Sequence, residues 1–304
     1  MRNTFAKTLY TIGKQDPKVV IVVADISPAG SMASFREEFP ERFINVGVAE
    51  QNMIGLCAGM ALRGLKPFAY TIATFTIYRP FEMVRDDLCY QNLPVTVVGI
   101  GGGVTYSALG GTHHAQEDVA LMSALPNMTI VAPCDPLEVE AATWHCSQSK
   151  SPTYLRLGKA GEPVFTEKAI EPFVYGKARY IQRGQDVCVI AYGPIMKMAK
   201  EVAEGLEAKG KSVSLVSMHT LKPLDREGLI RSMREHKKVV VIEEHSQFGG
   251  LAMSAKQIAW ESKASCSLQT FSLKDEFIHC YGSHADLLKA HGLATGLILS
   301  AVST

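Results

Sequence analysis

The alternation of short apolar runs with longer amphipathic stretches constrains the fold of this chain most strongly. The runs are rich in β-branched residues, which favours strands buried on both faces, and the amphipathic stretches are typical of helices that connect such strands. The runs are Val19–Asp25, Pro94–Ile100 and Met128–Pro133 in the first half, and Asp186–Gly193, Ser212–Met218 and Lys238–Glu244 in the second. The pattern predicts an α/β protein built from parallel sheets.

The alternation is interrupted once, which divides the chain into two predicted doubly wound domains. A stretch with Pro172 and several glycines and charged residues shows little periodicity, as expected for a linker. We therefore expect a first domain at residues 1–165, a linker at 166–183 and a second domain at 184–304. The second domain should close with a short strand of sequence SLQTFSL, a loop and a helix.

Composition excludes several classes of protein. The chain has 31 Lys and Arg against 30 Asp and Glu, a net charge of +1, so no overall field attracts it to nucleic acid or to an anionic membrane. Its seven cysteines contain no CxxC pair, which favours reduced core thiols over a disulfide framework or a structural zinc site. We find no signal-peptide core near the start and no apolar run of about 18 residues, and we expect a cytoplasmic protein.

One carboxylate, Glu50, lies within an unusually apolar part of the sequence. Glu50 follows the apolar run INVGVA and begins the apolar stretch Glu50–Leu62, which predicts a buried helix packed through Gly55 and Gly59 inside an assembly. A carboxylate at a helix start can simply interact favourably with the helix dipole. Alternatively, a buried Glu is a tuned acid or base, because burial without a partner is unfavourable.

The segment TFTIYRPFE carries aromatic residues at three-residue spacing, namely Phe75, Tyr78 and Phe81. Such spacing is more often core than a platform for a ligand ring. Arg79 and Pro80 interrupt the run, which favours a loop or helix start lined by aromatic rings. The segment could therefore stack on a flat cofactor ring.

A glycine-rich stretch, GGGVTYSALGGTHHAQED, follows the run that ends at Ile100 and holds the pair His113 and His114. Glycines allow close approach of a backbone to a ligand, and imidazoles can donate to substrate oxygens. The stretch lacks the spacing of a Walker or GxGxxG motif, so it is weak support for nucleotide binding. A metal site is an alternative, with Glu117 as the one nearby carboxylate at partly suitable spacing.

The segment PTYLRLGKAG places Arg156 and Lys159 three residues apart. The pair is either two solvated cations or a site for a phosphate or sulfonate.

Together, seven ordered segments resemble the pyrimidine-binding part of a transketolase followed by a transketolase C-terminal domain. They are VADIS, INVGVAEQNMIG, ATF-x-x-Y, GGTHHAQED, PNMTIVAPCDP, HTLKPLD and VIEEHSQFGGL. The resemblance covers essentially the whole chain.

The resemblance implies thiamine diphosphate as cofactor and gives four residues a place near it. Glu50 resembles the glutamate that hydrogen-bonds the aminopyrimidine ring of the cofactor. Tyr78 resembles the aromatic residue that stacks on this ring, with Phe75 in the same pocket, and Asp25 resembles an acidic position near the cofactor.

The resemblance also implies a set of substrate-binding residues. His113 matches the substrate-facing histidine of a G-x-T-H motif, and His114 could assist it or be structural. Lys159 stands where transketolases carry an arginine for the sugar phosphate, with Arg156 beside it and Arg2 matching a second such arginine. No metal ligand is assigned to this chain.

Departures from the family pattern concern the substrate and the partner. Leu109 replaces an aspartate that contacts the donor's hydroxyl, and Ala29 replaces a serine of the phosphate site. No Gly-Asp-Gly motif is present, although the family holds Mg²⁺ and the diphosphate with one. The resemblance therefore implies a separate N-terminal subunit that carries this motif, in a heterotetramer of two large-half and two small-half subunits (α2β2).

The implied activity is transfer of a two-carbon ketol group from an anionic ketose to an aldose. Two thiamine-dependent alternatives share this architecture: the β subunit of a 2-oxo acid dehydrogenase and a deoxyxylulose-phosphate synthase. A thiamine-binding regulatory subunit without catalysis is a third alternative, which Glu50, Tyr78 and His113 argue against.

Overall fold

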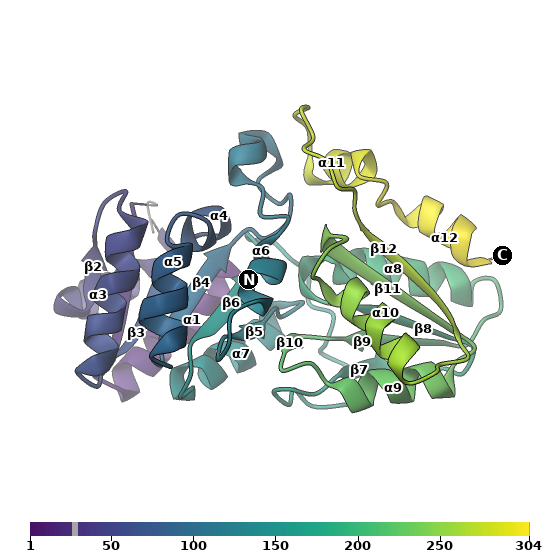
Figure 1. Cartoon of the computed structure of the whole chain (residues 1–304), viewed down its shortest axis with the longest axis horizontal. Helices are drawn as coiled ribbons and strands as arrows, with labels where there is room; N and C mark the ends of the chain where they lie inside the picture. Colours follow the sequence, from purple (N-terminus) through teal and green to yellow (C-terminus); the bar gives the residue numbers. More distant parts are fainter. Residues whose placement is uncertain (26–29, 304) are drawn as a thin grey trace.

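A computed structural model describes residues 1–25 and 30–303 and contains two sheets that lie side by side (Figure 1). The described residues of the first sheet form seven strands in the order β10-β5-β6-β4-β3-β1-β2. They are β1 (Val19–Val23), β2 (Phe43–Asn45), β3 (Lys66–Ile72), β4 (Thr96–Ile100), β5 (Thr129–Val131), β6 (Thr153–Leu157) and β10 (Thr220–Lys222). All pairs are parallel except β10 with β5. The predicted α/β class is confirmed.

The second sheet has five strands in the described residues, in the order β12-β11-β8-β9-β7. They are β7 (Arg179–Gln182), β8 (Val187–Ala191), β9 (Val213–Ser217), β11 (Lys238–Ser246) and β12 (Ser267–Leu273). Only β7 is antiparallel to its neighbour within this sheet. The strands β8 and β9 are buried along their whole length, as expected for parallel strands covered on both faces.

Helices cover both faces of the first sheet, so that alternate residues of one strand enter different cores. In β1, Val19, Ile21 and Val23 pack in the same core as α1 (Arg2–Gln15) and α7 (Pro136–Gln148). Val20 and Val22 point to the other face, where α3 (Glu50–Leu62) and α6 (Asp118–Ser123) pack.

The remaining helices complete the two units. The first has α2 (Ala33–Glu38), α4 (Ala73–Ile77), α5 (Phe81–Met83), the π-helix η3 (Val84–Tyr90) and the 3₁₀ turns η1 (Gly30–Met32), η2 (Pro40–Arg42), η4 (Ser107–Leu109) and η5 (Gly111–His113). The second has η6 (Gly193–Ile195), α8 (Met196–Glu207), α9 (Arg226–Glu235), α10 (Leu251–Glu261), α11 (His284–Ala290) and α12 (Thr295–Ser303).

The segment between the two sheets makes ordered contacts with both. Asp135, at the start of α7, accepts hydrogen bonds from the backbone N–H groups of Phe165 and Thr166. Strand β7 lies within the stretch 166–183 that the sequence analysis assigns to a linker. Strand β10 leaves the second half of the chain to pair with β5 of the first sheet. The two units are therefore joined by a shared strand as well as by the connecting segment.

Helix α3 has the predicted bounds, but only one of its faces is covered. Leu56 and Leu62 are exposed. A Cβ placed on Gly55 or Gly59 would meet no described atom within 4 Å outside the helix itself. None of the described elements of the single chain lies against this face, and the predicted packing of these glycines inside an assembly stays a prediction.

One stretch, His284–Ser303, has the length and mean hydropathy of a membrane span, which the sequence analysis did not anticipate. The structure divides it into α11 and α12 around Gly292, whose φ is +83°. Leu287, Ile298 and Val302 pack in the core of the second unit.

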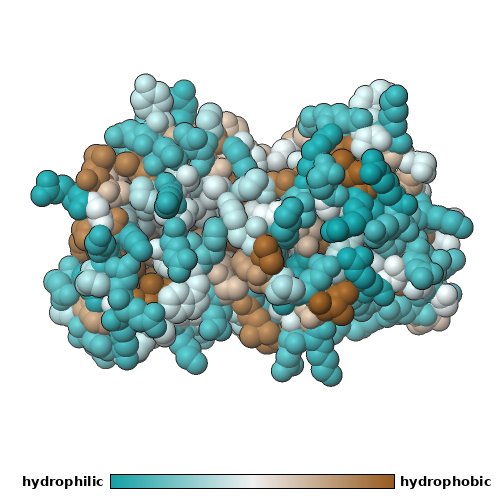
Figure 2. Space-filling model, turned by 90° about the horizontal axis from the view of Figure 1, so that it is seen from below, coloured by the Kyte–Doolittle hydropathy of each residue, from teal (hydrophilic) through white to brown (hydrophobic). Residues whose placement is uncertain are grey.

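In the view of Figure 2 the surface is mainly hydrophilic, and apolar residues gather in separate patches.

Candidate active site

Most of the predicted site residues follow strands of the first sheet at one edge. Asp25 follows β1, Glu50 follows β2, Tyr78 follows β3 with α4, and Lys159 follows β6. The loop after β4 carries His113. Because these strands are parallel, their carboxyl ends meet at the same edge, where α/β proteins bind ligands.

Glu50 is the first residue of α3 and is only 3% exposed. Its Oε1 accepts a hydrogen bond of 2.8 Å from Nη1 of Arg79, which is the one side chain in the described part of the chain that bonds this carboxylate. Arg79 itself is 48% exposed. The buried carboxylate thus has a charge partner and sits at the positive end of a helix dipole.

A continuous set of ring contacts leads from Arg79 to Lys159. The guanidinium carbon of Arg79 lies 4.4 Å from the ring centre of Phe75. The Phe75 ring meets the His113 ring edge-on, with 5.1 Å between centroids. Tyr106 lies beyond His113 at 6.4 Å, and Nζ of Lys159 is 5.3 Å from the Tyr106 ring centre. Glu50, Phe75, His113 and Lys159 therefore belong to one cluster.

His113 is half-buried in η5, and its Nδ1 lies 3.0 Å from Oγ1 of Thr112. Burial lowers the pKa of His113, and the charge of Arg79 lowers it further. The ring is therefore neutral near pH 7, with one nitrogen able to donate and the other able to accept a hydrogen bond.

Tyr78 caps the C-terminal end of α4 and donates its hydroxyl to Oε2 of Glu117 at 2.7 Å. Burial raises the pKa of Tyr78, so the hydroxyl keeps its proton and the donor role is fixed. Sequence reasoning considered Glu117 only as a partner for metal binding. The structure shows it holding one of the predicted cofactor-binding aromatic residues.

Asp25 is exposed and has a left-handed backbone with a φ of +48°. Its N–H donates to Oδ1 of Asn45, which also accepts from the N–H of Gly47. Asn45 thereby links the end of β1 to the turn that leads to Glu50. Ala29 lies outside the described residues.

The start of the chain meets the end of β6. The backbone N–H of Arg2 donates to the carbonyl of Lys159 at 3.2 Å. Burial raises the pKa of Tyr106 and the charge of Arg2 opposes this, which places Arg2 within electrostatic reach of the same ring that Lys159 covers. Leu109, in η4, is 50% exposed.

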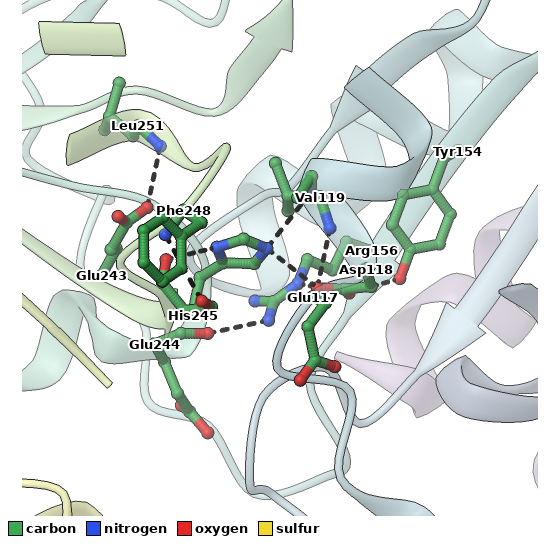
Figure 3. A network of polar contacts seen from close by, with 12 residues as sticks. Glu117, Asp118, Val119, Tyr154, Arg156, Glu243, Glu244, His245, Phe248 and Leu251 are labelled. Carbon is green, nitrogen blue, oxygen red and sulfur yellow. Dashed lines mark hydrogen bonds and ion pairs between the residues drawn. The ribbon is translucent and has the colours of Figure 1, made fainter. Parts of the chain in front are cut away.

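Arg156 lies elsewhere, in a buried network between the two units (Figure 3). It is 2% exposed, and its Nε donates to Oδ2 of Asp118 at 2.8 Å. Its Nη2 donates to the backbone carbonyl of Glu244 at 2.9 Å, and Tyr154 donates its hydroxyl to the same Asp118 oxygen at 2.7 Å. The prediction that Arg156 anchors a substrate anion is corrected: its donors face Asp118 and Glu244.

Figure 3 also shows His245 of the second unit beside this network. The N–H of Ala120 donates to Nε2 of His245, so the proton of this ring is on Nδ1, which donates to the carbonyl of Ser246. Nε2 of His245 also lies 4.0 Å from Oδ1 of Asp118.

The glycine-rich stretch approaches this network rather than open space. A Cβ at Gly102 would lie 2.5 Å from the guanidinium of Arg156, and one at Gly103, where φ is +68°, would lie 2.4 Å from Glu244 Oε1. His114 is 3% exposed, and burial lowers its pKa. These two glycines therefore leave room for side chains of the chain itself, and His114, expected either to assist His113 or to be structural, is buried in the chain.

Family models account for nearly the whole chain. One described as the transketolase pyrimidine-binding domain matches residues 1–161, and one described as the transketolase C-terminal domain matches residues 176–296. The chain belongs to the transketolase family.

Several proteins that are similar to the chain over nearly their whole length are described as subunits or as products of a split gene. It is 32% identical to a subunit of the apulose-4-phosphate transketolase of Phocaeicola vulgatus, covering 96% of this chain and 93% of that protein. It is 34% identical to the 6-deoxy-6-sulfo-D-fructose transketolase subunit of a Clostridium species, covering 86% and 81%. A solved split-gene transketolase, described as an inactive β4 tetramer, superimposes with a TM-score of 0.89 at 35% identity, covering 99% and 96%.

These findings confirm the resemblance drawn from the sequence. The chain is the C-terminal subunit of a split transketolase, a transferase whose other half is an N-terminal subunit. Membership in this transketolase family implies thiamine diphosphate as the cofactor.

Proposed function

We propose that this transketolase subunit, assembled with its N-terminal partner, transfers a two-carbon ketol group from an anionic ketose to an aldose. The observation that carries the proposal is the contact cluster at the sheet edge, in which the buried Glu50 is linked through Arg79 and Phe75 to His113. It combines a carboxylate for proton handling, an apolar ring surface and a neutral imidazole.

The residues present fit the pyrimidine half of thiamine diphosphate. Glu50 uses Oε1 for Arg79, which leaves Oε2 to hold a ring nitrogen. The half-buried rings of Tyr78 and Phe75 offer apolar surface for stacking, and Asp25 lies at the neighbouring strand end. When bound, the cofactor supplies the electron sink for cleaving the carbon–carbon bond of the donor.

We assign Mg²⁺ and the diphosphate to the partner subunit. The chain contains no Gly-Asp-Gly sequence, and the described residues form no group of three His, Cys, Asp or Glu suited to a metal ion. The structure described as an inactive β4 tetramer supports a requirement for the second subunit. We propose an α2β2 assembly, and a cytoplasmic location that agrees with the free state of all seven cysteines.

The substrate end of the site faces His113 and Lys159. His113, neutral near pH 7, would donate a hydrogen bond to a substrate oxygen, and its polarising effect is greatest where charge develops in the transition state. Lys159 and Arg2 would hold the distal anion, whose binding positions the reacting carbon. The relatives named for apulose 4-phosphate and sulfofructose support an anionic sugar. Leu109 supplies no polar group, so the donor's hydroxyl must find a different contact.

The deciding experiment is an assay of the coexpressed two-chain enzyme with thiamine diphosphate, Mg²⁺, xylulose 5-phosphate or fructose 6-phosphate and an aldose, with pyruvate in parallel. Ketol transfer that requires both chains supports the proposal. Decarboxylation of pyruvate without ketol transfer would favour a 2-oxo acid dehydrogenase or a deoxyxylulose-phosphate synthase. Cofactor binding without turnover of any of these substrates would indicate an unusual sugar, in line with the departures at Leu109 and Ala29.

A single substitution tests the role of Glu50. Glu50→Gln keeps the shape and the contact with Arg79 but cannot carry the proton, so we expect turnover to fall by at least about 100-fold with folding intact. Circular dichroism and kcat of the two-chain enzyme are the measurements. Wild-type turnover in this variant would refute the assignment.

A further inference from the structure

We propose that Arg79 is a positioning residue that joins the two halves of the site, holding one oxygen of Glu50 and placing its guanidinium over the Phe75 ring that His113 contacts. The inference rests on the proposed function, since it gives Glu50 the role of holding the cofactor ring. Neither the family resemblance nor the sequence pattern assigned Arg79 a role.

The guanidinium of Arg79 contacts both Glu50 and Phe75. Nη1 of Arg79 donates to Glu50 Oε1 at 2.8 Å, and the same guanidinium lies 4.4 Å from the ring centre of Phe75. Two contacts on different sides restrict the long side chain, although 48% of it is exposed. A guanidinium restricted in this way loses little further freedom when it holds a carboxylate. The contact uses Oε1, so Oε2 of Glu50 stays oriented for a ligand.

Arg79 also provides the opposite charge for a buried carboxylate. Glu50 is 3% exposed, and a buried carboxylate without a partner is strongly unfavourable. Arg79 supplies the opposite charge from the solvent side. Such a contact restricts the carboxylate to one orientation before any ligand arrives, and preorganisation of this kind strengthens binding.

His113 meets the same Phe75 ring that the guanidinium of Arg79 covers. Among the described residues, the titratable and charged groups near His113 are Arg79, Tyr106 and His114, and Lys159 lies over the ring of Tyr106. After burial, the charge of Arg79 is the second cause that lowers the pKa of His113. One guanidinium therefore acts on both the carboxylate that would hold the cofactor and the imidazole that would face the substrate.

The test compares Arg79→Gln, which removes the charge, with Arg79→Lys, which keeps it. Arg85→Gln is the matched control, because Arg85 follows in the same segment, is 63% exposed and pairs with Asp86. The first readout is the titration of the His113 ring by NMR in the full chain without partner, assigned by loss of its signal in His113→Gln. We expect the pKa of His113 to rise in Arg79→Gln and to stay near the wild-type value in the other two variants.

The second readout is the Kd of thiamine diphosphate in the two-chain enzyme with Mg²⁺, measured by calorimetry. We expect roughly fivefold weaker binding in Arg79→Gln, a partial recovery in Arg79→Lys and wild-type binding in Arg85→Gln. Unchanged titration of His113 in Arg79→Gln would overturn the link to His113. If Arg79→Gln binds thiamine diphosphate as tightly as the wild type or more tightly, the positioning role is overturned. Arg79 would then only cover Glu50 in the absence of the cofactor.

The two proposals fail in different ways. If the wild-type two-chain enzyme transfers no ketol group, the proposed function fails, whereas the titration of His113 in the single chain still decides whether Arg79 acts on it.

Discussion

Replacing Arg156 by Met should destabilise the chain strongly and leave substrate affinity unchanged. Arg156 is 2% exposed and Asp118 is 0% exposed, so the substitution leaves a buried carboxylate whose remaining partners are the Tyr154 hydroxyl and the N–H of Val119. Breaking a buried pair from one side typically costs about 3–5 kcal/mol. The carbonyl of Glu244 also loses its donor across the junction of the two units.

Urea denaturation of the full chain measures this loss as a change in the free energy of unfolding. We expect a loss of about 3–5 kcal/mol, a large fraction of the roughly 5–15 kcal/mol that stabilises an ordinary domain. The double variant Asp118→Asn with Arg156→Met should be more stable than Arg156→Met alone, because the uncompensated charge is gone. The exposed Arg85→Gln control should change the value by less than about 0.5 kcal/mol.

The same Arg156 variant separates a structural role from a substrate role. In the two-chain enzyme that remains folded at low temperature, we expect the KM for anionic sugars to stay within about twofold of the wild-type value. A stability loss below about 1 kcal/mol together with a tenfold rise in KM would refute the structural reasoning and return Arg156 to the substrate site.

Three further outcomes follow from the contacts described above. Lys159→Ala should raise the KM for phosphorylated or sulfonated sugars about tenfold with little change in kcat, and an unchanged KM would remove Lys159 from the site. Glu117→Ala and Tyr78→Phe should each weaken the binding of thiamine diphosphate. Because the two residues share one hydrogen bond, the double variant should bind no more weakly than the weaker-binding single variant. Additive losses of binding free energy would contradict this shared hydrogen bond. The pKa of His284 is raised by its contact with Glu244, so this pair should stabilise the fold fully below about pH 6.5 and lose its effect as pH rises through the native pKa. Urea titrations at pH 6, 8 and 9 should therefore show a stability difference between wild type and His284→Gln that shrinks with pH, and a constant difference would contradict the coupling.

Much of the first unit was predictable from local sequence. The runs at β1, β4 and β5 identify buried strands because β-branched residues on both faces leave few alternatives, and the stretch at α3 gave the helix bounds. Strands β2, β3, β6, β7 and β10 were not predicted. Of these, β7 and β10 are short edge strands whose pairing partners lie far along the chain. Their four and three residues carry little pattern of their own.

The candidate site divides in the same way. Glu50, Phe75, Tyr78 and His113 stand in recognisable local contexts at strand ends, and the fold brings them to one edge. Arg79 and Glu117 were not assigned to the site, because only their contacts in the folded chain identify them as site residues. Arg79 meets a carboxylate 29 residues away, and Glu117 meets a hydroxyl 39 residues away.

Arg156 and Lys159 show most clearly what sequence alone determined and what the tertiary structure decided. The sequence determines that two cations stand three residues apart near the end of the predicted first domain. Arg156 falls inside β6, where its side chain is buried against Asp118 and Glu244, 38 and 88 residues away. Lys159 falls two residues beyond the strand and is exposed at the sheet edge. Whether a cation holds the protein together or faces a substrate depends on the groups that surround it, and folding brings those groups from distant parts of the chain.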